Sequence, residues 1–388
     1  MDQTFFIASE WILLALFASL LSIRLGVSVA LIEILVGIVG GNAIHIEITP
    51  WVNFLASFGA VVLTFLAGAE IDPDSVRSNL KASLVIGILS FLAPFLAGMG
   101  FAYYWFGWSV NAAKIAGIAL STTSVAVVYA VMVESGLSAS SLGQAILAAC
   151  FVTDLGTVLA LGVLFTGFSA KLVWFAIVLV LVLIASTPAA ARLFKAYGGR
   201  VSEAEIKFVF FILAALAYMA VISGSEAVLP AYIIGMAMAG FFKKYRETLH
   251  KIRAIVFTAF TPFYFIKAGV LVSFGALYSM AGVIALFLVV KVAAKFAGVL
   301  PAAAYFRYER RTGMYTTLLM STGLTFGTIS SLYGLSNNYI NADQYSVLVA
   351  TVILSAVVPT IIAQKYFFPD IQTEDSPDSP MEELPETD

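Results

Sequence analysis

Charged side chains are scarce in this 388-residue chain. They make up 11% of it, whereas 61% of the residues are hydrophobic and the mean hydropathy is +0.98. An ordinary soluble domain carries about 25% charged residues. The composition therefore excludes a soluble globular protein and predicts an all-α chain that crosses a membrane many times.

Several other features are also missing. The single cysteine, Cys150, excludes an intramolecular disulfide. Asp2 and Glu10 stand where a signal peptide would be basic, so we expect the first apolar segment to be a membrane span. We find no phosphate-binding loop and no metal-ligand cluster. We therefore expect no cofactor, no enzyme activity and no nucleic-acid partner.

Thirteen apolar segments are long enough, or nearly so, to cross a bilayer. They cover residues 5–23, 27–41, 52–69, 80–106, 112–133, 143–165, 172–197, 206–222, 227–242, 254–272, 282–305, 312–333 and 346–367.

The lysines and arginines predict the orientation of these spans. With the N-terminus outside, sixteen fall on the cytoplasmic side, and only Lys114 and Lys171 fall outside. Cytoplasmic loops are normally enriched in these residues. We therefore expect an integral inner (plasma) membrane protein with its N-terminus outside and its C-terminus in the cytoplasm.

The last 20 residues differ in composition from the rest. Residues 369–388 contain eight acidic residues, four prolines and no basic residue. Such a composition predicts a disordered cytoplasmic tail that follows a transmembrane unit covering residues 1–368.

Asp154 places a carboxylate near the middle of the apolar segment 143–165. At 1.5 Å per helical residue, it lies about 16 Å from the start of that segment, near the midplane of a hydrocarbon core about 30 Å thick. A charge there is costly and usually functional. The alternative interpretation is a hydrogen-bonded structural carboxylate.

Lys295 lies at a matching depth in segment 282–305, and Lys291 lies one helical turn before it. We interpret both as candidate charge partners of Asp154. Two alternatives stay open: Lys291 can extend its head toward the outer interface, and Lys295 can pair with another buried acid as a structural residue.

Two segments carry helix-breaking residues at this depth. The fifth contains Leu-Ser-Thr-Thr-Ser-Val at 120–125, and the twelfth contains Met-Ser-Thr-Gly-Leu-Thr-Phe-Gly-Thr at 320–328. Close helix packing through small residues is the alternative for either one. Together they predict two discontinuous helices in two inverted six-helix repeats that are joined by the seventh span. In this plan of secondary transporters, the binding site lies at the midplane between the broken helices.

At these residues the sequence resembles the monovalent cation:proton antiporter superfamily, in its bacterial sodium/proton and potassium/proton exchanger branch. The similarity extends over most of residues 5–367 as an ordered series of short motifs. The motifs are 29–41 (VALIEILVGIVGG), 65–72 (FLAGAEID), 121–128 (STTSVAVV), 224–235 (GSEAVLPAYIIG), 262–270 (PFYFIKAGV), 295–301 (KFAGVLP) and 353–363 (ILSAVVPTIIA).

The resemblance implies a core transport domain, with spans at about 80–165 and 282–367, and a separate domain that forms a homodimer. It also implies alternating access by movement of the core. The family's cation-binding aspartate corresponds to Asp154, and its basic residue corresponds to Lys295. The chain departs from the family at Thr153, where electrogenic relatives have a second acid and many electroneutral relatives have Asn. Lys267 is unusual in a motif where an apolar residue is expected, and we interpret Glu33 as structural.

These observations predict a secondary transporter in which a proton and a monovalent cation compete for Asp154. Oxygen ligands for the cation are expected from Thr153, Thr157, Thr122, Thr123 and Ser124, together with unwound backbone carbonyls. With one titrating acid, we expect electroneutral exchange of one proton for one Na⁺ or Li⁺ and a role in pH homeostasis. A potassium/proton antiporter, a sodium-coupled solute symporter and a passive cation channel are the alternatives. An intramembrane protease is disfavoured.

Overall fold

The computed structural model describes residues 2–70, 73–166, 170–200, 202–225 and 227–369. Within these ranges the chain is helical and contains no strand. Nine helices of this part of the chain are long and apolar enough to cross a membrane. The predicted tail, apart from its first residue, lies outside the described residues.

Each of the thirteen predicted spans coincides with a helix or with a pair of consecutive helices. The helices and the two π-helical turns, η1 and η2, run as follows: α1 (Asp2–Leu25), α2 (Val29–Val39), η1 (Gly40–Ile44), α3 (Pro50–Ala69), α4 (Pro73–Tyr104), α5 (Val110–Ser121), α6 (Val125–Glu134), α7 (Ser141–Leu161), η2 (Gly162–Thr166), α8 (Ala170–Tyr197), α9 (Ala204–Ile222), α10 (Val228–Phe242), α11 (Arg246–Ala259), α12 (Thr261–Val270), α13 (Phe274–Ser279), α14 (Ala281–Tyr305), α15 (Arg310–Met320), α16 (Thr325–Ser336) and α17 (Ala342–Tyr366).

Both predicted interruptions are present. In the fifth span, α5 ends at Ser121 and α6 begins at Val125. Ser124 caps the new helix, because its side-chain oxygen accepts the backbone N–H of Val127 at 3.4 Å. In the twelfth span, α15 ends at Met320 and α16 begins after a non-helical stretch. The prediction of two discontinuous helices is confirmed.

A third interruption was not predicted. Segment 254–272 was expected to be one continuous span, but α11 ends at Ala259 and α12 begins at Thr261. Pro262 lies in the first turn of α12, where its missing N–H costs no helical hydrogen bond. Proline in this position explains why a new helix starts here.

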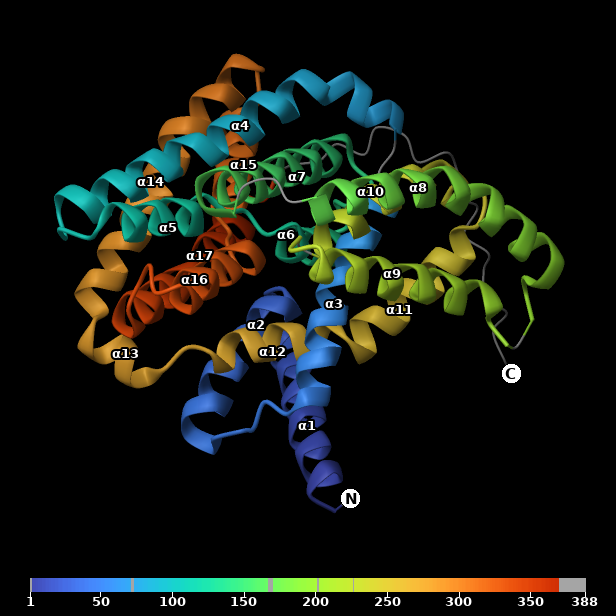
Figure 1. Ribbon diagram of the computed structural model, residues 1–388, viewed down its shortest axis with the longest axis horizontal. Helices are drawn as coiled ribbons and strands as arrows, with labels where there is room; N and C mark the ends of the chain where they lie inside the picture. The colour runs from blue at the N-terminus through green and yellow to red at the C-terminus, as the bar shows by residue number, and fades with distance from the viewer. Residues whose placement is uncertain (1, 71–72, 167–169, 201, 226, 370–388) are drawn as a thin grey trace, which may run out of the picture.

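The helices form two groups (Figure 1). The first, which we call the core group, contains α4–α7 and α14–α17. In it, α4 packs against α5, α7 and α14, and α17 packs against α14, α15 and α16. The scaffold group contains α1–α3 and α8–α12, in which α3 packs against α10 and α12, and α2 packs against α1 and α12. Helix α6 lies at the centre of Figure 1, between α3 of the scaffold group and α7.

The scaffold group contains a very close approach between α3 and α10. A Cβ added at Gly235 would overlap the carbonyl oxygen of Phe65, and one added at Gly68 would overlap the carbonyl oxygen of Tyr232. Small residues allow helices in membranes to pack backbone against backbone. These two glycines therefore hold α3 and α10 together as one unit.

Candidate functional site

The two interrupted helices meet at their breaks. The backbone N–H of Ser124 donates to the carbonyl oxygen of Thr322 at 3.2 Å. The hydroxyl of Thr123 donates to the carbonyl oxygen of Met320 at 2.8 Å. Each break thus satisfies backbone groups that the other helix would leave unpaired in the apolar interior. The contact fixes four half-helix ends at one place.

Asp154 lies beside this crossing, on α7. The Asp154 carboxylate interacts electrostatically with the backbone N–H of Val125, the first residue of α6. The positive end of a helix dipole and its free N–H groups favour an anion at this position. The carboxylate oxygen Oδ1 is buried and has no hydrogen-bond partner among the described residues. One oxygen of Asp154 is therefore left for a ligand.

A narrow space, too small in this state to hold a water molecule, adjoins this carboxylate. Its walls come from both groups of helices, because Thr64 lies on α3 and Phe326 on α16. Phe151 and Tyr232 also line this space, and their rings are stacked with the centroids 4.4 Å apart. The Thr64 hydroxyl was missed by the sequence analysis, because no local pattern separates it from the many other hydroxyls of the chain.

The five predicted ligand residues are all buried, but their hydroxyls have different tasks. Thr153 donates to the carbonyl oxygen of Ala149 at 3.0 Å, and Thr122 donates to that of Ala119 at 3.0 Å. The hydroxyl hydrogens of Thr153 and Thr122 are therefore used by carbonyl groups of their own helices.

The hydroxyl of Ser124 lies 3.4 Å from the hydroxyl of Thr325, between the two broken helices. The structure brings Ser124 and Thr123 to the crossing directly, with Asp154 beside it.

Lys295 is fully buried and uses all three of its N–H donors. It donates to Ser90 Oγ at 2.8 Å, to the carbonyl oxygen of Ser121 at 2.9 Å and to Thr123 Oγ1 at 2.8 Å. Ser121 is the last residue of α5, so the ammonium group stabilises the negative end of that half-helix. Asp154 is within electrostatic range of Lys295, but the two form no ion pair among the described residues.

Lys291 reaches the other break. Its side chain is fully buried, and its Nζ has no hydrogen-bond partner in the part of the chain that the structure describes. A Cβ at Gly323 would overlap this Nζ and would lie 2.9 Å from Thr122 Oγ1. Gly323 therefore makes room for the ammonium group. The side chain turns inward to the crossing. It does not extend to the outer interface, which was the alternative interpretation from the sequence.

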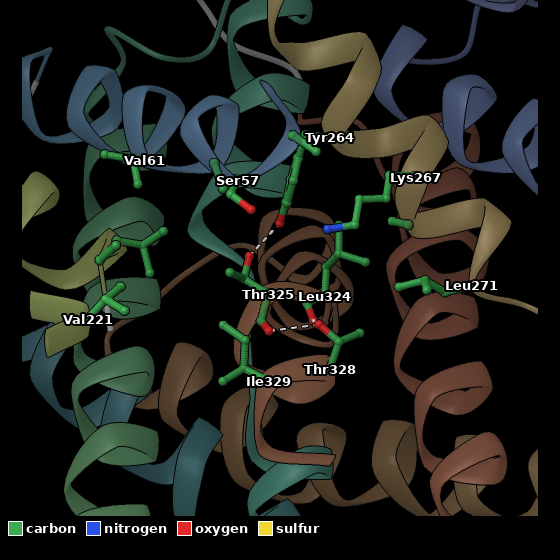
Figure 2. Close-up of a pocket in the computed structure, with 15 residues that line it drawn as sticks. Ser57, Val61, Val221, Tyr264, Lys267, Leu271, Leu324, Thr325, Thr328 and Ile329 are labelled. Atoms are coloured by element: carbon green, nitrogen blue, oxygen red, sulfur yellow. Dashed lines mark hydrogen bonds between the residues drawn. The ribbon is translucent and has the colours of Figure 1, made fainter. Parts of the chain in front are cut away.

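A cavity of about 270 Å³ reaches the crossing from one side (Figure 2). Lys267 and Tyr264 of α12 face it from the scaffold group, and Thr325 and Thr328 of α16 face it from the core group. The Tyr264 hydroxyl bonds to that of Thr325 at the end of the cavity near the crossing. We call this cavity the vestibule.

On the opposite side a polar bridge joins the two groups. Glu70 Oε1 accepts the Tyr129 hydroxyl from α6 at 2.6 Å and Arg253 Nε from α11 at 2.8 Å. Gln144 of α7 donates to the carbonyl oxygen of Glu70 at 2.8 Å. These bonds tie core helices α6 and α7 to scaffold helices α3 and α11. We call Tyr129, Gln144, Glu70 and Arg253 the polar bridge.

The remaining singled-out acid lies elsewhere. Glu33 is buried on α2, and its Oε2 has no hydrogen-bond partner among the described residues. Its charged neighbour is Glu134, whose carboxylate accepts the backbone N–H of Val29 at 2.8 Å. Glu33 is thus part of the contact between α2 and α6 and not of the Asp154 site.

Two interrupted helices crossing beside a buried carboxylate, with cavity walls from two groups of helices, define a secondary-transporter fold. Two solved structures share it. The sodium proton antiporter MjNhaP1 from Methanocaldococcus jannaschii at pH 8 matches with a TM-score of 0.68 and 14% identity over 95% of this chain and 100% of that one. The electron microscopy map of MjNhaP1 matches with a TM-score of 0.74 and 12% identity, over 94% and 96%.

Sequence comparison gives the family. Residues 12–368 match the profile of the transmembrane sodium/hydrogen exchangers. The chain is 26% identical to "Probable Na(+)/H(+) antiporter 3" of Methanocaldococcus jannaschii, over 88% of this chain and 89% of that protein. It is 26% identical to "Na(+)/H(+)-K(+) antiporter GerN" of Bacillus cereus, over 92% and 95%. The chain belongs to the transmembrane sodium/hydrogen exchanger family and is an integral membrane protein, as the sequence motifs predicted.

Proposed function

We propose that this protein exchanges protons for Na⁺ across the membrane by alternating access, and that Asp154 binds either ion. One observation carries the proposal: a buried carboxylate oxygen that has no hydrogen-bond partner in the described part of the chain, beside the crossing of two interrupted helices. The Na⁺/H⁺ antiporters among the relatives support Na⁺ and H⁺ as the two exchanged ions.

The physical basis is the cost of an uncompensated charge in an apolar interior. An ionised carboxylate there is unfavourable unless a positive partner or hydrogen bonds compensate it. The Val125 N–H compensates Asp154 in part, and the Lys295 ammonium is engaged by three neutral oxygens. A proton or a bound cation supplies what is missing. The two exclude each other because the proton removes the charge that holds the cation.

A bound cation needs oxygen ligands that replace its water. Asp154 Oδ1 supplies one, and we assign others to Thr64 in the adjoining space and to Ser124 and Thr123 at the crossing, with Thr153 and Thr122 behind them. With one titrating carboxylate and a threonine before it, the exchange is electroneutral, one proton for one cation.

Alternating access requires the core group to move against the scaffold group. We assign the core domain to spans at about 80–165 and 282–367 and the remaining spans to the scaffold, which also holds the contact of a homodimer. We assign the basic face to the cytoplasm, and with it the polar bridge to the inner side and the vestibule to the outer side. In this state the vestibule extends to the crossing from the outer side, and on the inner side the polar bridge ties the two groups beside a second cavity of about 300 Å³.

The test uses purified protein in liposomes with an internal pH indicator. Addition of NaCl or LiCl outside the liposomes is expected to drive protons out of the wild-type liposomes, toward the side of addition, so that their interior becomes alkaline, and Asp154→Asn is expected to abolish this movement. The Thr328→Val variant, which alters the vestibule and leaves the carboxylate in place, serves as the matched control. Exchange by Asp154→Asn at the wild-type rate would overturn the assignment.

Potassium is the second candidate, because one relative is an "Na(+)/H(+)-K(+) antiporter". Selectivity depends on the number and spacing of the ligands. KCl compared side by side with NaCl in the same liposomes distinguishes the two ions. Cation flux without proton movement would identify a channel instead.

A further inference from the structure

Lys267 places a positive charge in the vestibule through which the proposed cation reaches the crossing. Figure 2 shows its side chain extending from α12 across the cavity toward Leu324 and Thr325 at the break of the twelfth span. Of the described residues that line the vestibule, it is the only lysine, arginine, aspartate or glutamate. A cation that enters the vestibule therefore meets a like charge before it meets any described carboxylate.

The position of this ammonium group is held by the scaffold. Lys267 Nζ donates to the side-chain oxygen of Asn53, near the start of α3. The side chain is partly buried, and most of the residues that line the vestibule with it are apolar. The bond to Asn53 is exposed, but a charge beside a largely apolar wall is screened less than a charge in bulk water. The charge is thus part of the vestibule and not a freely moving surface lysine.

We propose that Lys267 acts as a tethered cation that sets the apparent affinity of this protein for the transported cation on the vestibule side. Its ammonium group lowers the local concentration of free cations by repulsion. It also competes with them for the oxygens at the end of the vestibule near the crossing. The consequence is directional: the affinity is reduced on the vestibule side alone, whereas the polar-bridge side is unaffected. This proposal rests on the cation exchange proposed above.

The first experiment measures the KM for Na⁺ on each side of oriented proteoliposomes. Lys267→Met is expected to lower the KM on the vestibule side about tenfold, which corresponds to about 1.4 kcal/mol, with little change in the maximal rate or in the opposite KM. Lys267→Arg keeps the charge and is expected to keep the wild-type KM. Lys114→Met is the matched control, because it removes a lysine of the same predicted side that does not line the vestibule.

A second variant keeps the proposal testable if methionine disturbs folding. The native Cys150 is fully buried, so Lys267→Cys can be modified selectively by an impermeant thiol reagent from the vestibule side. An ammonium-bearing reagent is expected to restore the high KM, and a neutral reagent of the same size is expected to leave it low.

Equal KM values for Lys267→Met and the wild type, or equal effects of the charged and neutral reagents, would overturn the proposal. Absence of exchange in the wild type would instead overturn the proposed function. The two failures are thus distinguishable.

Discussion

At the scale of single residues, the site contains two buried lysines with different surroundings. Lys295 has three hydrogen bonds to neutral oxygens of α4 and of the fifth span, whereas Lys291 fills the space beside Gly323 without a bond among the described residues. The geometry therefore favours a positioning role for Lys295, which joins α14 to the end of α5.

Lys295→Met is expected to lower the stability of the protein. The substitution leaves the Ser121 carbonyl and the Thr123 hydroxyl without this buried donor, at a cost of about 1–3 kcal/mol for each unsatisfied group. The midpoint of thermal unfolding in detergent should fall, while sodium-driven proton movement persists at a reduced rate. Unchanged stability together with complete loss of exchange would show that Lys295 acts on the ions directly.

Sequence reasoning found the buried charges but not all of their neighbours. Asp154 and Lys295 were predictable because a charge at mid-membrane depth is rare and costly. Thr64, Tyr264 and Ser90 reach the site from other helices, and their types are common in any apolar span. Only tertiary packing distinguishes them.

At the scale of helices, the two predicted breaks have a local cause. Runs of hydroxyl residues at 121–124 and of glycine with hydroxyls at 321–328 weaken the helix and satisfy the freed backbone. The break between α11 and α12 escaped prediction because a proline within an apolar segment indicates either a kink or a new first turn, and the contacts of the chain decide between them.

The contact of α3 with α10 gives a prediction for these elements. Gly235→Ala is expected to destabilise the protein by about 1–3 kcal/mol, because the new methyl group overlaps the Phe65 carbonyl and the two backbones must separate. Gly240→Ala on the same helix meets no atom within 4 Å and serves as the control. Thermal unfolding of both variants checks this. An equal midpoint for the two would contradict the packing argument.

At the scale of the whole molecule, the two sides differ. The vestibule lies on one side of the crossing. On the other side, Tyr129, Glu70 and Arg253 connect the core and scaffold groups, and Glu70 and Arg253 also line a cavity of about 300 Å³. Alternating access requires the bonds of the polar bridge to break when the vestibule closes. We therefore expect the polar bridge to be a contact specific to this state.

Tyr129→Phe is expected to shift the equilibrium away from this state. Loss of one hydrogen bond to a carboxylate is worth about 1.5–3 kcal/mol, which lowers the population with an open vestibule about tenfold or more. The KM for Na⁺ on the vestibule side should rise, since apparent affinity scales with the competent fraction, and that on the opposite side should fall. Tyr218→Phe, at an exposed position on α9, is the control. Unchanged KM values on both sides would mean that the bond does not bias the states.

The central claim is that one carboxylate binds either a proton or a cation. It is tested most directly by adding Na⁺ to the purified protein in weakly buffered detergent solution and measuring the protons released. About one proton is expected to be released for each Na⁺ bound, with apparent Na⁺ affinity falling as pH is lowered, and no proton is expected to be released from Asp154→Asn. Sodium binding without proton release, or equal release from Asp154→Asn, would contradict it.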